Sequence, residues 1–176
     1  MRTIIPGVGT VAMGGAPGLS VGLVVWQSDG SARLNLGAQD AGNSFLTLHG
    51  LDGQQRVGLF ASETGISGIE ILDGKSRPRV QLGIEPVVDQ SYLVISSAAG
   101  GSAFQVHMEK EGSGSAGLRS SETKDEVLLH CRKGTEPTLS VIANARERLR
   151  FSVDATGAPA LWVLESDGKV TWKSPK

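Results

Sequence analysis

Apolar residues recur along the chain in pairs that are separated by one residue, and the pairs repeat at a fixed spacing. Leu46 and Leu48 are followed 23 residues later by Ile69 and Ile71. Alternation with a period of two is typical of a β-strand with one buried face, and a fixed repeat is typical of tandem structural units. The pattern therefore predicts tandem β units of about 23 residues.

The repeat extends over most of the chain. Arg33, Arg56 and Arg79 are also spaced by 23 residues, and Leu161 opens a last unit six periods after Leu23. The spacing is looser over residues 92–138. We expect about seven units from residue 23 onward.

Each unit contains an expected hairpin, with Asp52-Gly53 as the two-residue loop of a type I′ turn in the second unit. This loop places apolar pairs on one face and polar pairs on the other. A slip of one residue would destroy the separation. The expected cross-strand pairs in the second unit are Leu48–Val57, Leu46–Leu59, Thr47–Gly58 and His49–Arg56. In the first unit they are Val25–Leu34 and Leu23–Leu36, and in the last unit Val163–Trp172.

The connections between units also contain reversal signals. Residues 40–42 and 63–65 are predicted to be three-residue loops with Gly in the last, left-handed position. They would bring Leu36 opposite Leu46, and Leu59 opposite Ile69. Both kinds of turn reverse the chain, so the sequence predicts an all-β, continuous antiparallel meander of up to fourteen short strands.

Two other architectures are less compatible with the sequence. A parallel solenoid would stack Arg33, Arg56 and Arg79 about 4.8 Å apart, which is unfavourable for like charges. A transmembrane barrel needs strands of about 9–11 residues, longer than those expected here. In the meander one sheet face is apolar, so we expect the sheet either to fold over into a sandwich or to be covered by a partner.

Residues 1–22 precede the clear repeats and are rich in Gly and apolar residues. Pro6 and Pro17 break any helix, so the segment reads neither as a signal peptide nor as a membrane span. We predict two parts, an extended docking arm at 1–22 and a repeat domain at 23–176. The arm's expected contact residues are Ile4, Ile5, Val8 and Val11.

The pattern LxLxxxDGxxRVxLG, together with the closing copy DGKVTWKSP at 167–175, resembles that of a group of uncharacterised bacterial β-hairpin repeat proteins. The resemblance covers residues 23–83 well and residues 139–175 in part. Residues 92–138 depart from it, because they lack the Asp-Gly turn and the Arg. The resemblance implies an architecture and no activity.

Charge and motif content narrow the function classes. The chain has 17 basic and 18 acidic residues, so it lacks the positive surface of a general nucleic-acid binder. His49, His107 and His130 fall on separate strands, and His130 points away from its neighbour Cys131. We predict no catalytic residue, no metal site and no cofactor. The single cysteine, Cys131, is compatible with a reducing compartment, and the expected lack of a signal peptide mildly favours the cytoplasm; the compartment otherwise stays unknown.

Two surface features are candidates for partner contact. Arg146, Arg148 and Arg150 alternate along one strand, so their guanidinium groups are expected on one face, where they could bind an acidic partner or lipid headgroups at a membrane surface. An ordinary solvated face is the competing interpretation. Trp26 and Trp162 are expected on the polar face of the first and last hairpins, opposite Arg33 and Lys173.

These features favour a non-catalytic structural or accessory subunit that packs against other protein subunits, such as an extrinsic subunit of a membrane complex or part of a fibre. The alternative is a carbohydrate- or cell-wall-binding module. That alternative needs aromatic platforms in every unit, whereas the candidate Trp residues belong to the first and last units only.

Overall fold

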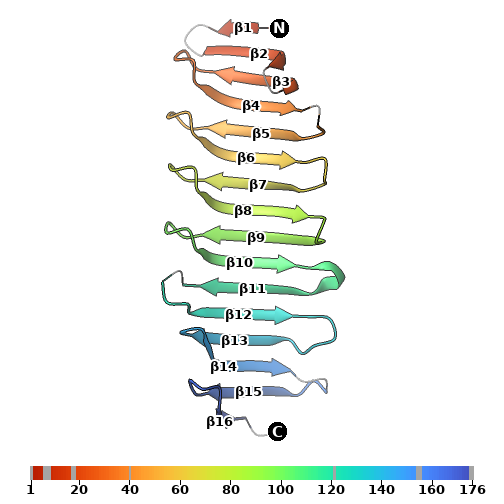
Figure 1. Ribbon diagram of the computed structural model, residues 1–176, viewed down its shortest axis with the longest axis vertical. Helices are drawn as coiled ribbons and strands as arrows, with labels where there is room; N and C mark the ends of the chain where they lie inside the picture. Colours follow the sequence, from red (N-terminus) through yellow and green to blue (C-terminus); the bar gives the residue numbers. More distant parts are fainter. Residues whose placement is uncertain are drawn as a thin grey trace. The chain divides into compact units, whose positions relative to one another are not determined.

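The computed structural model describes residues 2–5, 9–16, 19–39, 41–120, 122–153 and 156–174. The chain divides into two compact units, Met1–Val87 and Val88–Lys176. Each unit is an antiparallel β-meander in which every strand pairs with the next strand in the sequence (Figure 1).

The first unit contains eight strands among its described residues. They are β1 (Arg2–Ile5), β2 (Gly9–Ala16), β3 (Leu19–Trp26), β4 (Ala32–Ala38), β5 (Ser44–His49), β6 (Gln55–Ala61), β7 (Ser67–Leu72) and β8 (Pro78–Glu85). The second unit has the same plan, interrupted by one short 3-10 turn, η1 (Lys110–Gly112). Its strands are β9 (Gln90–Ser96), β10 (Ser102–Met108), β11 (Gly114–Arg119), β12 (Glu126–Cys131), β13 (Thr138–Ala143), β14 (Arg146–Val153), β15 (Pro159–Leu164) and β16 (Val170–Lys173).

The predicted fold class is confirmed. In the described part of the chain, β3 to β16 are the fourteen strands expected from residue 23 onward, and they form seven antiparallel hairpins. The parallel solenoid is excluded by the antiparallel pairing. Within each unit the described strands pack along their lengths only against their sequence neighbours, so neither unit closes as a sandwich.

The segment predicted to be a separate arm continues the sheet of the first unit. β1 pairs with β2, and β2 pairs with β3. The boundary expected after residue 22 lies inside β3 and is therefore wrong as a structural division. Alternation in this segment is hidden by its many glycines, but its backbone amides find partners in the same way as those of the later strands.

Cross-strand pairing follows the apolar pattern. All the expected apolar pairs are present, among them Leu48 opposite Val57 and Leu46 opposite Leu59. The two three-residue connections are also confirmed. Gln39 N–H donates to the Asn43 carbonyl across the first, and Ser62 N–H donates to the Ile66 carbonyl across the second, both at 2.8 Å. Asp40 of the first loop lies outside the described residues.

The turn around Asp52-Gly53 differs from the prediction. Gly50 N–H donates to the Gln54 carbonyl at 2.8 Å, so three residues form the loop, and Gly53 has a φ of 75°. The pairing then shifts by one residue, because Arg56 is an extra residue in a β-bulge. The longer loop and the bulge cancel, so the apolar register equals that of a two-residue turn.

Two predicted polar pairs are wrong for the same reason. His49 lies opposite Gln55 instead of Arg56, and Trp26 lies opposite Ala32 instead of Arg33. Two further arginines are extra residues in bulges. Arg79 lies opposite the step from Ile71 to Leu72, and Arg148 lies in β14.

Candidate functional site

Large apolar side chains form two parallel rows, here called the apolar ladders, across one face of each unit. Successive members of a ladder are direct cross-strand partners, so their side chains touch within one face. In the first unit the ladders are Val11–Val25–Leu34–Leu48–Val57–Ile71–Val80 and Met13–Leu23–Leu36–Leu46–Leu59–Ile69–Leu82. In the second unit they are Ile95–Phe104–Leu118–Val127–Val141–Leu149–Val163–Trp172 and Leu93–Val106–Ala116–Leu129–Leu139–Phe151–Leu161.

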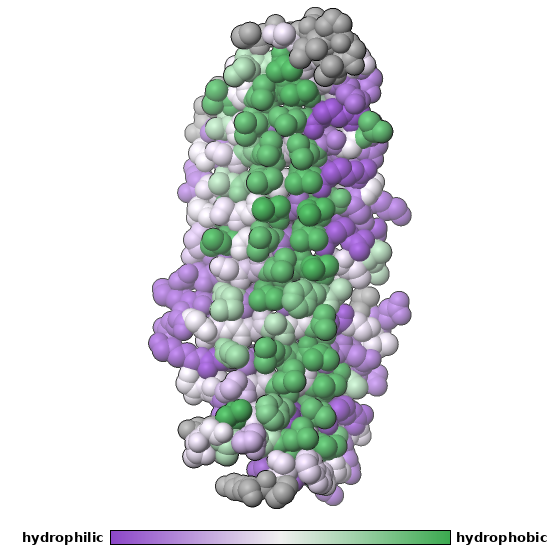
Figure 2. Space-filling view, turned by 180° about the vertical axis from the view of Figure 1, so that it is seen from behind, coloured by the Kyte–Doolittle hydropathy of each residue, from purple (hydrophilic) through white to green (hydrophobic). Residues whose placement is uncertain are grey.

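The apolar ladders are open to solvent. Figure 2 shows them in each unit as a hydrophobic band with hydrophilic side chains on both sides. Leu82 is 50% exposed, Ile71 44% and Leu139 38%. Among the described residues the only buried hydrophobic side chain is Val24, which lies on the other face. The ladder side chains are therefore shielded from solvent mainly by their neighbours in the same face.

The opposite face, here called the polar face, is the better covered one. The described residues with buried positions all lie on it: Val24, Gly58, Gly83, Gly117, Ser140 and Ser152. Ser152 is 1% exposed, and its hydroxyl donates to the Glu136 carboxylate at 3.3 Å. At Gly58 an added Cβ would lie 2.5 Å from the Gln55 amide nitrogen. Long side chains of the same chain thus cover small residues here.

The total exposed surface is large for the mass. The chain of 18.4 kDa exposes 10979 Å². A compact monomer of this mass would expose about 8,200 Å², and two separate compact bodies of half the mass about 9,900 Å². A single-layer sheet leaves one whole face uncovered, and the excess surface reflects this.

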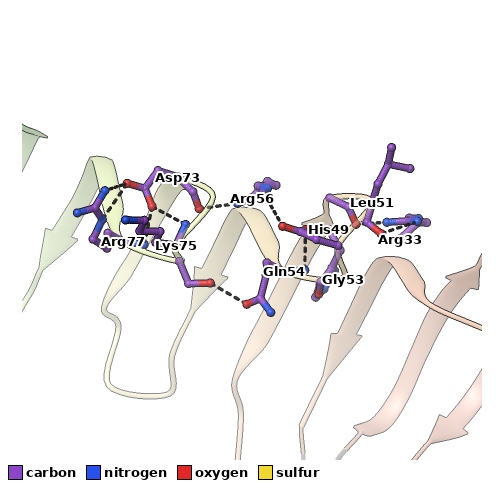
Figure 3. Close-up of polar contacts among 12 residues, drawn as sticks. Arg33, His49, Leu51, Gly53, Gln54, Arg56, Asp73, Lys75 and Arg77 are labelled. Carbon is purple, nitrogen blue, oxygen red and sulfur yellow. Dashed lines mark hydrogen bonds and ion pairs between the residues drawn. The ribbon is translucent and has the colours of Figure 1, made fainter. Parts of the chain in front are cut away.

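Arginines at the bulges connect successive hairpins along the rim of the first unit (Figure 3). Arg56 donates to the Asp73 carbonyl of the next hairpin's turn at 2.5 Å, and it also pairs with the Asp52 carboxylate. Arg33 makes the equivalent bond one repeat earlier, to the carbonyl of Gly50. A planar guanidinium can serve its own turn and the next one together. In the second unit Arg146 also bonds to a later turn, at the Ser166 carbonyl, although the bulge of its strand lies at Arg148.

The turn aspartates stabilise the conformation of their turns. Asp52 accepts from Gln54 N–H at 3.1 Å, and Asp167 accepts from Lys169 N–H at 2.9 Å. The hydrogen bond from the Arg77 side chain is the main cause that holds the pKa of Asp73 far below its ordinary value, and backbone N–H groups add to it. In the turn between β7 and β8 the left-handed position belongs to Ser76, with a φ of 57°, and not to Gly74.

The predicted contacts of the N-terminal segment are only partly described. Ile4 and Ile5 belong to β1, and only their backbone is described. Val8 lies outside the described residues. Val11 is half-buried and is the first member of an apolar ladder.

The three arginines of β14 are in different surroundings. The bulge at Arg148 interrupts the alternation on which their common face was predicted. Arg150 forms two bonds with Glu147, which also accepts from Ser140, and Arg146 is bonded to Ser166. Burial alone would raise the pKa of Glu147, but the bonds from Arg150 and Ser140 outweigh it and lower the pKa. A binding role for these arginines stays a prediction.

The two candidate tryptophans differ. Trp162 lies opposite Lys173 as expected, and the Lys173 ammonium is 5.1 Å from the centre of its indole ring. Trp26 is half-buried at the end of β3. Their role in partner contact stays a prediction.

Other chemistry is sparse in the described residues. Within them, no three His, Cys, Asp or Glu side chains gather closely enough to hold a metal ion. They also include no helix with the length and apolar character of a membrane span. His49 lies among Thr47, Asn35 and the Gly53 carbonyl, in the polar network of the first unit.

Sequence reasoning missed the function of the bulge arginines. Arg33, Arg56 and Arg79 were recognised as a repeat, but the bonds from Arg33 and Arg56 to the next turn were not. The available signal was their fixed place three residues after the left-handed residue of each turn, at positions 30, 53 and 76.

No family model matches the sequence, and no curated protein matches it significantly. The geometry of the two faces is therefore the basis for assigning a function.

Proposed function

We propose that the chain is a non-catalytic structural subunit, and that its apolar ladders are the contact surface of a larger protein assembly. The observation that carries the proposal is the inversion of the two faces. The polar face is covered by the chain itself, whereas two rows of Val, Leu, Ile and Phe are open.

Physical chemistry supports a partner for this surface. Monomeric proteins rarely expose contiguous apolar patches larger than a few hundred Å². Burial of apolar surface stabilises by about 25 cal/mol per Å², so a row of half-exposed large side chains is a strong driving force for association.

The test combines light scattering with a dye that binds exposed apolar surface. The full chain is purified, its mass is measured during size-exclusion chromatography, and the fluorescence of anilinonaphthalene sulfonate is recorded. Either a defined assembly or a chain that binds the dye strongly supports the proposal. A monodisperse species of 18.4 kDa that leaves the dye at its free fluorescence would overturn it.

A further inference from the structure

We infer that the partner of the apolar ladders is the same chain, and that three copies pack their ladders around a common axis as the three sides of a prism. This inference rests on the proposed function and specifies its partner. It is argued from the ladders of the first unit, Met1–Val87.

The surface of the chain matches its own repeat. Strands in a sheet lie about 4.8 Å apart, so the ladders present side chains at that period. A second sheet with the same period can place one side chain level with each of them. Copies of this chain related by rotation about an axis along the ladders meet strand for strand, so Leu59 would lie level with Leu59 of the other copies.

Area and charge both allow self-association. The surface in excess of two compact bodies of half the mass is about 1,100 Å², which exceeds the about 800 Å² that each partner contributes to a stable interface. A net charge of −1 gives the copies little mutual repulsion.

The size of the side chains across a strand indicates three copies instead of two. Beside the ladder that contains Leu59 runs a third row on the same face of the first unit. Its end members, Val21 and Ile84, are large, and the four members between them are small: Ala38, Ser44, Ala61 and Ser67. Two sheets in a sandwich stay about 10 Å apart over their whole width, so small residues there would leave a gap. In a three-sided prism the sheets converge toward each edge, and the small row fits the narrowing space.

The strand length fits the same arrangement. β5 has six residues, which span about 20 Å. In an equilateral triangle with sides of about 20 Å, each side lies about 6 Å from the axis, slightly more than half of the usual distance of about 10 Å between packed sheets. Leu and Ile side chains at the middle of each strand would therefore reach the axis and fill the interior.

The experiment is the mass of the full chain and of three variants by light scattering. The expected mass is that of three chains, 3 × 18.4 = 55.2 kDa. Leu59→Glu places a charge in the interior and should reduce the mass to that of one chain at micromolar concentration. Leu51→Glu makes the same exchange in a turn, at a side chain that is 83% exposed, and should keep the mass of the parent.

The third variant separates a prism from a sandwich. Ala61→Leu enlarges the small row, so it should raise the dissociation constant of a three-sided prism at least tenfold, whereas in a sandwich it would fill a gap and tighten association. Circular dichroism of each variant verifies the β structure. If Leu59→Glu does not fold, Leu59→Ala replaces it, with a concentration-dependent loss of mass as the expected result.

A two-chain mass of 2 × 18.4 = 36.8 kDa, or an Ala61→Leu variant that associates as tightly as the parent, would overturn the three-sided arrangement. A monomer that binds the dye strongly, or a polydisperse aggregate, would overturn self-assembly but leave the proposed function in place. A monodisperse monomer without dye binding would overturn both.

Discussion

The two faces of each sheet differ in what shields them from solvent. On the polar face, side chains such as Gln55 and Glu136 extend over Gly58 and Ser152, so the chain covers this face with its own residues. On the apolar face, Leu59 and Ile69 contact their ladder neighbours but have nothing above them. The stability of the polar face and of the turns therefore arises within one chain, whereas under the proposed function the stability of the apolar face depends on association.

The largest expected effect tests that dependence on the apolar face. Ile69→Ala should lower the free energy of unfolding by about 2–5 kcal/mol if the face is covered in the assembled protein, because a buried Ile loses contacts and leaves a cavity. If the face stays open, the loss should be under about 1 kcal/mol.

Urea unfolding at several protein concentrations measures the effect of Ile69→Ala, and the midpoint of the parent should rise with concentration because association stabilises the folded state. Leu51→Ala is the matched control, since Leu51 lies in a turn and belongs to no ladder. Equal effects of the two substitutions would contradict the contrast between the faces.

The second-largest loss of stability is expected on the rim, and it should be independent of protein concentration. Arg56→Ala removes the bond to the Asp73 carbonyl and the pair with Asp52. We expect a loss of about 1–2 kcal/mol, because a charged donor to a carbonyl contributes more than a neutral one while solvent weakens the exposed pair. Arg56→Lys should restore less than half, since an ammonium lacks the planar geometry that serves both turns.

The measurement for Arg56 is again the urea midpoint, at two protein concentrations. Lys75→Ala removes an exposed cation from the adjacent turn and should change the midpoint little. An Arg56→Ala effect that grew with concentration would show that the rim also takes part in association.

Substitutions in two turns should change the free energy of unfolding by smaller amounts, one lowering it and the other raising it. Gly53 has a φ of 75° with open space where a Cβ would be, so Gly53→Ala should cost about 1 kcal/mol through the left-handed backbone alone. Ala145 occupies the same region, with a φ of 60°, and Ala145→Gly should stabilise by a similar or smaller amount. Thermal unfolding of the two variants checks both signs, and a shared sign would contradict the conformational explanation.

The pairing of the strands could be predicted because alternation specifies it. Leu48 opposite Val57 and Leu59 opposite Ile69 follow from placing every large apolar residue on one face, and any other register would mix the faces. The three-residue loop that ends in Gly65 was also readable, because Gly there fits the left-handed position.

The bulges could not be predicted from that pattern. A three-residue turn with an extra Arg56 gives the same apolar register as a two-residue turn at Asp52-Gly53, so the hydrophobic pattern does not distinguish them. Nor does alternation reveal whether a face is covered. The sequence shows that Leu59 and Ile69 share a side, but only the absence of a second layer over the described strands shows that this side is open.

The smallest expected effect concerns acid. It should arise in the Asp73 turn of a single chain, without any contribution from association. The pKa of Asp73 is lowered from its ordinary value of 3.8 chiefly by the hydrogen bond from Arg77. A carboxyl group with a lowered pKa in the folded state stabilises fully above its unfolded pKa, and the contribution disappears as the pH falls below about 4 toward the folded pKa. Asp73→Asn should therefore lower the urea midpoint slightly at pH 6 and flatten its decline between about pH 4 and pH 2.5. Because Asp73 lies on the rim, the flattening should be the same at every protein concentration; a flattening confined to concentrated samples would instead place this turn inside the assembly contact.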